Sequence, residues 1–189
     1  MITIIGAGAL GSHVALFLRN VGELEVVDFD RVEQKNILAQ FHSKMGLRKN
    51  KALALSQSMQ GLFGVKVRTV PHRLTKDNWS QILKDADLIL DCTDNIAARN
   101  LIHEWWDEYA VPVLHGALSA DGTFARIVWA EDFTADAEGE DGEATCIDGE
   151  HLPFFAMAAS LMAGQAQFFL KTGKKMSFQL SPTGIVRLT

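Results

Sequence analysis

MITIIGAGALGS, residues 1–12, is the stretch that decides the fold. Its first part, residues 1–5, is a short apolar run rich in β-branched side chains, which predicts a buried parallel strand. A GxGxxG spacing follows at once, and the apolar residues within 12–18 predict a helix. A second apolar run, residues 24–27, then ends on Asp28. This order of strand, glycine loop, helix, strand and acid is typical of a nucleotide-binding βαβ unit.

The glycine loop has a chemistry of its own. Glycines allow a tight turn and let backbone N–H groups approach a phosphate, while the N-terminus of the following helix supplies partial positive charge. An acid that closes the second strand can accept hydrogen bonds from ribose hydroxyls. The alternative is that the glycines serve only a tight turn and close helix packing. The residues predicted to bind a nucleotide here are Gly6, Gly8, Ala9, Leu10, Gly11, Asp28 and Asp30.

Length and composition are those of a globular domain. The 189 residues, 48% hydrophobic and 22% charged, predict a single domain over residues 1–189. The net charge of −5 is uneven, because residues 131–150 hold nine acids and no Lys or Arg, which leaves +4 on the rest of the chain. We expect the acidic stretch to be a loop or a disordered crossover. The net charge argues against a general nucleic-acid binder, and the basic remainder suits a polyphosphate ligand.

The two cysteines, Cys92 and Cys146, form no CxxC pair, so no structural zinc site is expected. The sequence begins directly with a strand, so we expect no signal peptide. The most apolar late segment, residues 154–163, is predicted to be too short to span a bilayer. We therefore expect a cytoplasmic protein without a membrane partner.

The rest of the chain alternates strands and helices. This alternation predicts an α/β, Rossmann-like, doubly wound and mainly parallel sheet with a short antiparallel C-terminal extension. Ligands of such sheets bind at the carboxyl ends of the strands, so the glycine loop, Asp28–Asp30 and Asp91–Asn95 should surround one crevice. The expected helices are 51–62, 79–83, 96–109 and 154–171, and the further strands are 65–70, 86–91, 111–114, 124–129, 176–180 and 185–188.

The polar residues Asp94, Asn36 and Lys51 distinguish between ATP with Mg²⁺ and NAD(P) as the possible cofactor. Asp94 follows Thr93 at the end of a predicted strand, where a carboxylate would repel phosphates unless a metal intervened. Mg²⁺, bound by one carboxylate and phosphate oxygens, removes that conflict. Asn36 and Lys51 could contact the phosphates. An NAD(P)-dependent oxidoreductase, the alternative, would leave Asp94, Asn95 and Lys51 without a function.

Five segments together resemble the ThiF/MoeB/HesA family, the bacterial relatives of ubiquitin-activating enzymes. They are GAGALGS, VVDFDRVEQKN, KALAL, LILDCTDNIAARNLI and VPVLHGALSADG. The resemblance implies ATP and Mg²⁺ as cofactors and adenylation of a carboxylate, typically the C-terminal glycine of a ubiquitin-like or sulfur-carrier protein. It also implies a homodimer.

The resemblance further implies roles for single residues. Asp28 would hold the ribose, Asn36 and Lys51 the phosphates, and Asp94 the Mg²⁺, while Asn95 stands beside it. Arg99 matches the arginine of the DNxxxR motif.

The chain also departs from the family pattern. Ala39 stands where the family has an arginine that faces the ATP phosphates, and the loss of such a donor typically costs about 3 kcal/mol in transition-state stabilisation. Arg48, Lys49 or a partner protein could supply the missing charge. The N-terminal segment of many relatives and their zinc-binding CxxC pairs are absent from this sequence. A degenerate, non-catalytic scaffold is therefore a second hypothesis.

Several single residues have competing interpretations. Cys146 resembles the place where some relatives carry a cysteine that forms a thioester or a persulfide, but its acidic neighbours would raise the pKa of the thiol and favour an inert one. Asp94 could instead cap the following helix. Asn36 could make only a local turn hydrogen bond, and Lys49 competes with Lys51 for the phosphates. His115 is interpreted as a structural histidine at a strand end.

Overall fold

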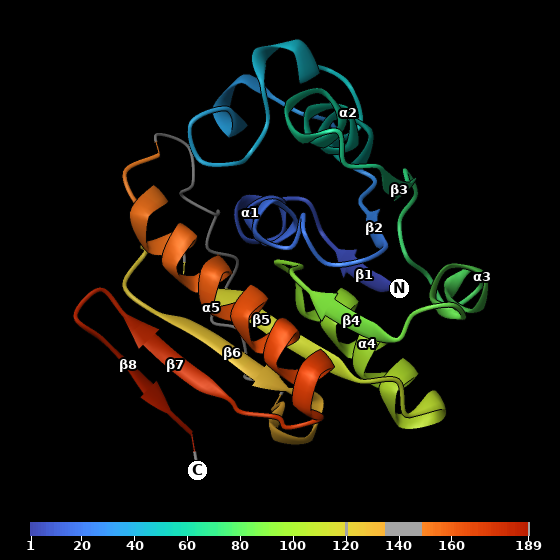
Figure 1. Ribbon diagram of the computed structural model, residues 1–189, viewed down its shortest axis with the longest axis vertical. Helices are drawn as coiled ribbons and strands as arrows, with labels where there is room; N and C mark the ends of the chain where they lie inside the picture. The colour runs from blue at the N-terminus through green and yellow to red at the C-terminus, as the bar shows by residue number, and fades with distance from the viewer. Residues whose placement is uncertain (120, 135–148, 189) are drawn as a thin grey trace.

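The computed structural model describes residues 1–119, 121–134 and 149–188. These residues form one eight-stranded sheet with the strand order β3-β2-β1-β4-β5-β6-β7-β8 (Figure 1). The strands from β1 to β5 are parallel, and the last three continue the sheet antiparallel. Their bounds are β1 Ile2–Ile5, β2 Leu24–Val27, β3 Val67–Val70, β4 Leu88–Asp91, β5 Val113–Leu118, β6 Ala125–Trp129, β7 Phe178–Ser181 and β8 Gly184–Arg187.

Helices cover both faces of this sheet, because successive residues of a buried parallel strand point to opposite sides. In β4, Leu88 and Leu90 belong to one apolar cluster and Ile89 to the other. The first cluster contains residues of α1 (Ala9–Phe17), α2 (Lys51–Phe63) and α5 (Leu152–Thr172). The second contains residues of α3 (Trp79–Leu83) and α4 (Ile96–Tyr109). Figure 1 shows α5 crossing in front of β5 and β6, with α4 behind the sheet. The predicted fold class is confirmed.

Local signals fix the ends of the helices that frame the site. The side chain of Asn50 caps α2 by accepting a hydrogen bond from the amide of Leu53, and α2 ends at Gly64, whose φ of 70° suits glycine. Helix α1 begins at Ala9, three residues earlier than predicted, because Gly8 already serves as its N-cap. The glycine loop therefore leads directly into the first helical turn.

The first residues of the acidic stretch are ordered by contacts distant in sequence. A short 3₁₀ helix spans Ala130–Asp132, and Asp132 accepts a hydrogen bond of 2.6 Å from the hydroxyl of Ser177. Glu131 forms an ion pair with Lys175. The described start of this stretch is therefore held in place, and the loop expected over residues 131–150 stays a prediction as a whole. Residues 135–148, with most of the acids and Cys146, lie outside the described residues.

Helix α5 spans Leu152–Thr172, which is longer than the predicted helix 154–171. Among the described residues, it is the one helix long and apolar enough to cross a membrane by length and composition. The expectation that this segment is too short for a bilayer is therefore wrong on length. In the fold, however, Phe155, Ala158 and Met162 of α5 are buried in the first apolar cluster, and α5 packs against α1. This core packing accounts for its apolar sequence.

The close packing of α5 is testable with two neighbouring substitutions. Ala159 is fully buried, whereas Ser160 beside it is exposed. Ala159→Leu forces added volume into the core, so we expect it to lower the free energy of unfolding by about 1–3 kcal/mol. Ser160→Leu, the matched control, should leave it nearly unchanged. Urea unfolding measures both, and equal midpoints for the two variants would contradict this packing.

Candidate functional site: a glycine loop beside the Asp94 loop

The glycine loop and the loop after β4 meet through a backbone contact. Gly6 has a φ of +93°, and a Cβ there would lie 2.7 Å from the carbonyl oxygen of Cys92 and 3.3 Å from the amide of Thr93. A Cβ on Gly11 would overlap the carbonyl oxygen of Gly6. These two positions therefore require glycine for the turn and its packing. The contact brings the chain around Asp94 to the glycine loop.

Gly8 has no such structural requirement. Its φ is −79°, which any residue adopts, and no described atom lies within 4 Å of the position its Cβ would take. It is the N-cap of α1, and the first hydrogen bond of that helix runs from the amide of Ser12 to the carbonyl of Gly8. The amides just before Ser12 precede the helical ladder and point out of the helix end. Open space at such an end suits a phosphate.

Asp28 ties β2 to the glycine loop. One carboxylate oxygen accepts from the amide of Ala7 at 2.6 Å, and the other accepts from the amide of Asp30 at 2.7 Å. Burial raises the pKa of Asp28, and these two hydrogen bonds and the charge of Lys51 act in the opposite direction. Each carboxylate oxygen can still accept a second hydrogen bond, so Asp28 remains available to a ribose hydroxyl.

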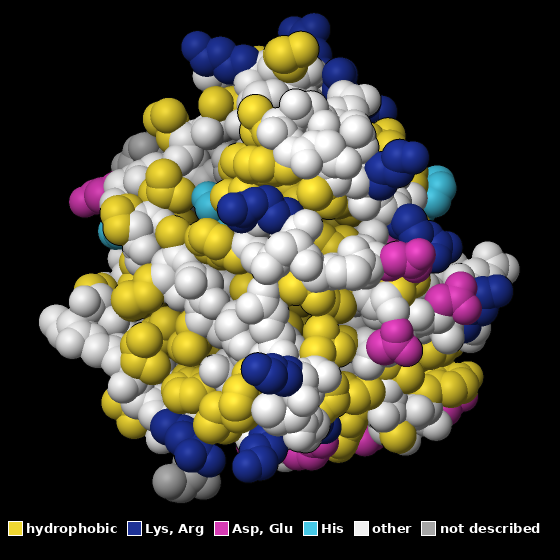
Figure 2. Space-filling model, viewed as in Figure 1, with side chains coloured by type: hydrophobic (Ala, Val, Ile, Leu, Met, Phe, Trp, Pro, Cys, Tyr) yellow, Lys and Arg dark blue, Asp and Glu magenta, His cyan; other side chains and the backbone are white. Residues whose placement is uncertain are grey.

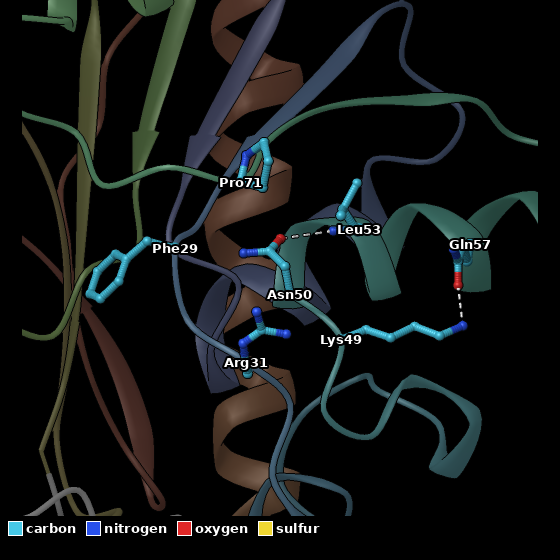
Figure 3. Close-up of a pocket in the computed structure, with 7 residues that line it drawn as sticks. All are labelled: Phe29, Arg31, Lys49, Asn50, Leu53, Gln57 and Pro71. Atoms are coloured by element: carbon cyan, nitrogen blue, oxygen red, sulfur yellow. Dashed lines mark hydrogen bonds between the residues drawn. The ribbon is translucent and has the colours of Figure 1, made fainter.

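The two candidate lysines point to different places. The amine of Lys51, on the first residue of α2, lies 3.4 Å from a carboxylate oxygen of Asp30, and its side chain is only 12% exposed. The amine of Lys49 instead donates to the side chain of Gln57 at 2.8 Å, along the outside of α2 (Figure 3). This geometry favours Lys51 over Lys49 as the phosphate contact.

Asn36 and Ala39 lie in the loop after β2. The side-chain oxygen of Asn36 accepts from the amide of Glu33 at 2.8 Å, which is the local turn hydrogen bond considered as an alternative. Only its amide NH₂ is left to donate to a phosphate. Ala39 is fully buried, so this position offers no donor.

The same loop holds the glycine loop in place through His42. Its Nε2 donates to the carbonyl of Ala7 at 2.9 Å, and the amide of Phe41 donates to the hydroxyl of Ser12. Burial lowers the pKa of His42 to about 4, and the nearby charges of Lys51 and His13 act in the same direction. No sequence motif marks His42, because its contact spans 35 residues.

The loop after β4 leaves the carboxylate of Asp94 free. Asn95, not Asp94, caps α4 by accepting from the amide of Ala98 at 2.9 Å, so the alternative that Asp94 is the cap is wrong. Asp94 is exposed and has no hydrogen-bond or ion-pair partner among the residues that the structure describes. Arg99 donates to the carbonyl of Thr93 at 2.9 Å and thereby anchors this loop.

A metal at Asp94 would need ligands from elsewhere. Within the described ranges, His, Cys, Asp and Glu form no group of three or more that could hold a metal ion. One carboxylate beside a phosphate-binding loop still fits Mg²⁺, which usually takes one or two protein carboxylates plus phosphate and water oxygens.

A separate hollow of about 370 Å³ lies behind the end of β2 (Figure 3). It is lined by Phe29, Arg31, Lys49, Asn50, Leu53, Gln57 and Pro71. Lys49 is thus the candidate lysine that belongs to this hollow, and Lys51 does not line it. Figure 3 shows Phe29 and Lys49 pointing away from its centre in opposite directions. On the face drawn in Figure 2, several Lys and Arg side chains surround the end of the molecule that carries α2 and the loop before it.

The sheet topology and the glycine loop at the carboxyl ends of the strands define an α/β protein of the Rossmann-like class. More specifically, the chain belongs to the ThiF family, whose model matches residues 1–180.

Curated relatives carry adenylyltransferase names. "Adenylyltransferase and sulfurtransferase UBA4" of Meyerozyma guilliermondii is 30% identical over 174 residues, which cover 86% of this chain and 41% of the relative. "Sulfur carrier protein adenylyltransferase" of Thermus thermophilus is 34% identical over 121 residues, 62% of this chain and 45% of the relative. The chain thus spans less than half the length of these relatives.

Solved structures share the fold. MccB of E. coli with ATP has a TM-score of 0.76 at 17% identity, over 100% of this chain and 63% of that chain. PaaA has a TM-score of 0.76 at 19% identity, over 99% of this chain and 62% of that chain.

His42 makes stability depend on pH. Its pKa is lowered from 6.5 to about 4, so the unfolded chain takes up a proton between these values and the folded protein does not. The fold therefore loses stability as pH falls through this window. Urea unfolding at pH 7.0 and 4.5 should show His42→Gln gaining about 2–3 kcal/mol relative to wild type at the lower pH. The same difference between the two proteins at both pH values would contradict this.

Gly8→Ala separates folding from ligand binding. The residue has open space and an ordinary φ, so an alanine fits there. The lower entropy of the unfolded chain offsets the weaker N-cap preference of alanine, and we expect a melting temperature close to that of wild type. The added methyl occupies the space through which a phosphate approaches, and ATP affinity should fall about tenfold or more, or about 1.4 kcal/mol. Gly61→Ala, in open space on α2, is the control and should bind ATP normally. Calorimetric titration with ATP and Mg²⁺ checks both.

Proposed function

We propose that this chain is an adenylyltransferase of the ThiF/MoeB type. It uses ATP with Mg²⁺ to activate a carboxylate, most specifically the C-terminal glycine of a ubiquitin-like or sulfur-carrier protein. The observation that carries the proposal is the free carboxylate of Asp94 on a loop that abuts the glycine loop, where Gly8 leaves open space. The family membership and the names of the curated relatives support the same reaction.

The reaction is an in-line transfer of the adenylyl group. A carboxylate oxygen of the substrate attacks the α-phosphorus, the bond from that phosphorus to the bridging oxygen breaks, and pyrophosphate leaves as an acyl-adenylate forms. The glycine-loop amides and Lys51 stabilise the phosphate charge, and Asp28 holds the ribose. Asp94 holds Mg²⁺, which when bound shields the phosphates from that carboxylate.

The proposal includes the remaining expectations from the sequence. Asn36 contributes its amide NH₂ to the phosphates, and Arg99 keeps the Asp94 loop in place. The protein is proposed to act as a homodimer in the cytoplasm. A thiol step at Cys146 is not needed for adenylation.

A non-catalytic scaffold is the second candidate function. The observation that favours it is the full burial of Ala39, which leaves the family's arginine position without a charged group. A scaffold would bind ATP or a partner protein without releasing pyrophosphate. Pyrophosphate exchange with small proteins that end in Gly-Gly separates the two candidates, because only the enzyme exchanges label.

Asp94→Ala tests the metal-binding role. The substitution should reduce Mg²⁺-dependent pyrophosphate exchange by about 10²–10³-fold, because the phosphates lose the cation that the carboxylate holds. Asp77→Ala removes another exposed acid, one outside the site, and should keep full activity. Thermal stabilisation of the wild type by ATP with Mg²⁺ but not by NAD is expected in parallel. Stabilisation by NAD alone would contradict the proposal and support an oxidoreductase.

A further inference from the structure

A buried histidine–carboxylate pair lies under the loop that carries Asp94. Asp91 ends β4, and His115 lies opposite it in the neighbouring parallel strand β5. Nδ1 of His115 donates to Oδ2 of Asp91 at 2.8 Å, and the two side chains are 3% and 0% exposed. Among the described residues, His115 is the one hydrogen-bond donor to Oδ2.

The surroundings keep the Asp91 carboxylate ionised. Burial raises the pKa of Asp91, but the hydrogen bond and charge of His115, the charge of Arg99 and the amide of Thr93 outweigh it and hold the pKa below its usual value. A buried carboxylate that loses one of these partners is costly, so the group depends on His115.

The other oxygen of Asp91 fixes the backbone that leads into Asp94. Oδ1 accepts from the amide of Thr93 at 2.9 Å and from its hydroxyl at 2.7 Å. Arg99 then holds the carbonyl of Thr93, and Asn95 is fixed as the cap of α4. Both neighbours of Asp94 are therefore held, while its own carboxylate is free.

We propose that His115 is a positioning residue for the metal held by Asp94. Through Asp91 and Thr93 it sets the direction of the Asp94 loop, so that the carboxylate meets Mg²⁺ and phosphates without reorganising. This inference rests on the proposed function. It predicts that loss of the His115 donor raises the Mg²⁺ concentration needed for half-maximal ATP binding, while the contacts of the glycine loop to ATP remain.

Two substitutions of His115 by amide side chains, Asn and Gln, distinguish a positioning role from a packing role. The side-chain nitrogen of Asn lies near the place of Nδ1, so His115→Asn keeps a donor for Asp91, whereas the longer His115→Gln places its nitrogen near Nε2. We expect His115→Gln to raise the Mg²⁺ concentration for half-maximal ATP binding by about 10–100-fold and His115→Asn to stay near wild type. The measurement is a titration with Mg²⁺ at a fixed ATP concentration, in which the melting temperature reports binding. The melting temperature of each variant without ligand is the reference.

Thr93→Val is the second variant if His115→Gln does not fold. It removes only the hydroxyl bond to Asp91, keeps the shape of the side chain, and should raise the Mg²⁺ midpoint in the same direction. Equal Mg²⁺ midpoints in wild type, His115→Gln and Thr93→Val, with lowered melting temperatures, would overturn the inference and make His115 a packing residue. If wild type itself does not bind ATP with Mg²⁺, the proposed function fails and the inference fails with it.

Discussion

The backbone of Gly6 rests against the carbonyl of Cys92 more closely than any side chain would permit, and the site depends on this contact. It arises because β1 and β4 are parallel neighbours in the sheet, so that both chains leave at the same edge. The Cα of Gly11 packs against the carbonyl of Gly6, and this contact completes the turn. Glycine costs conformational entropy of about 0.5–1 kcal/mol per position in regular structure, and close packing of two functional loops offsets that cost.

The glycine loop is also held from two other directions. Ala7 donates its amide to Asp28 at the end of β2, and its carbonyl accepts from His42 in the following loop. Because both backbone polar groups of Ala7 are hydrogen-bonded, the two peptide units on either side of its Cα are held in place before any ligand arrives. The amides at the start of α1 therefore form a preorganised set of donors, which is the arrangement that stabilises phosphate charge most effectively. Asp28 and His42 therefore both support the glycine loop, in addition to the ribose contact proposed for Asp28.

Much of the fold could be predicted from sequence because its signals are local. The apolar runs and the GxGxxG spacing each act over a few residues, and together they predict the mainly parallel sheet and the edge where the loops meet. Contacts between distant segments could not be predicted. Neighbouring Asp94 and Asn95 are both good caps by residue type, and only the three-dimensional path selects Asn95. The pairing of Asp91 with His115 depends on strand register across 24 residues, which no local pattern encodes.

The balance of charge explains why the substitution at Ala39 matters. Three carboxylates, Asp28, Asp30 and Asp94, belong to the candidate site, against two predicted cations, Lys51 and Arg99. The guanidinium of Arg99 already donates to the carbonyl of Thr93. His42 beside Lys51 stays neutral near pH 7 because burial lowers its pKa to about 4. Backbone amides and the dipole of α1 provide only partial charge. In the proposed reaction a polyphosphate in this crevice would meet more negative than positive charge, and the Mg²⁺ proposed at Asp94 would reverse that balance. Because the side chain of Ala39 supplies no charge, the proposed site would depend more on the direction of the Asp94 carboxylate, and the buried pair of Asp91 and His115 holds the loop that sets this direction.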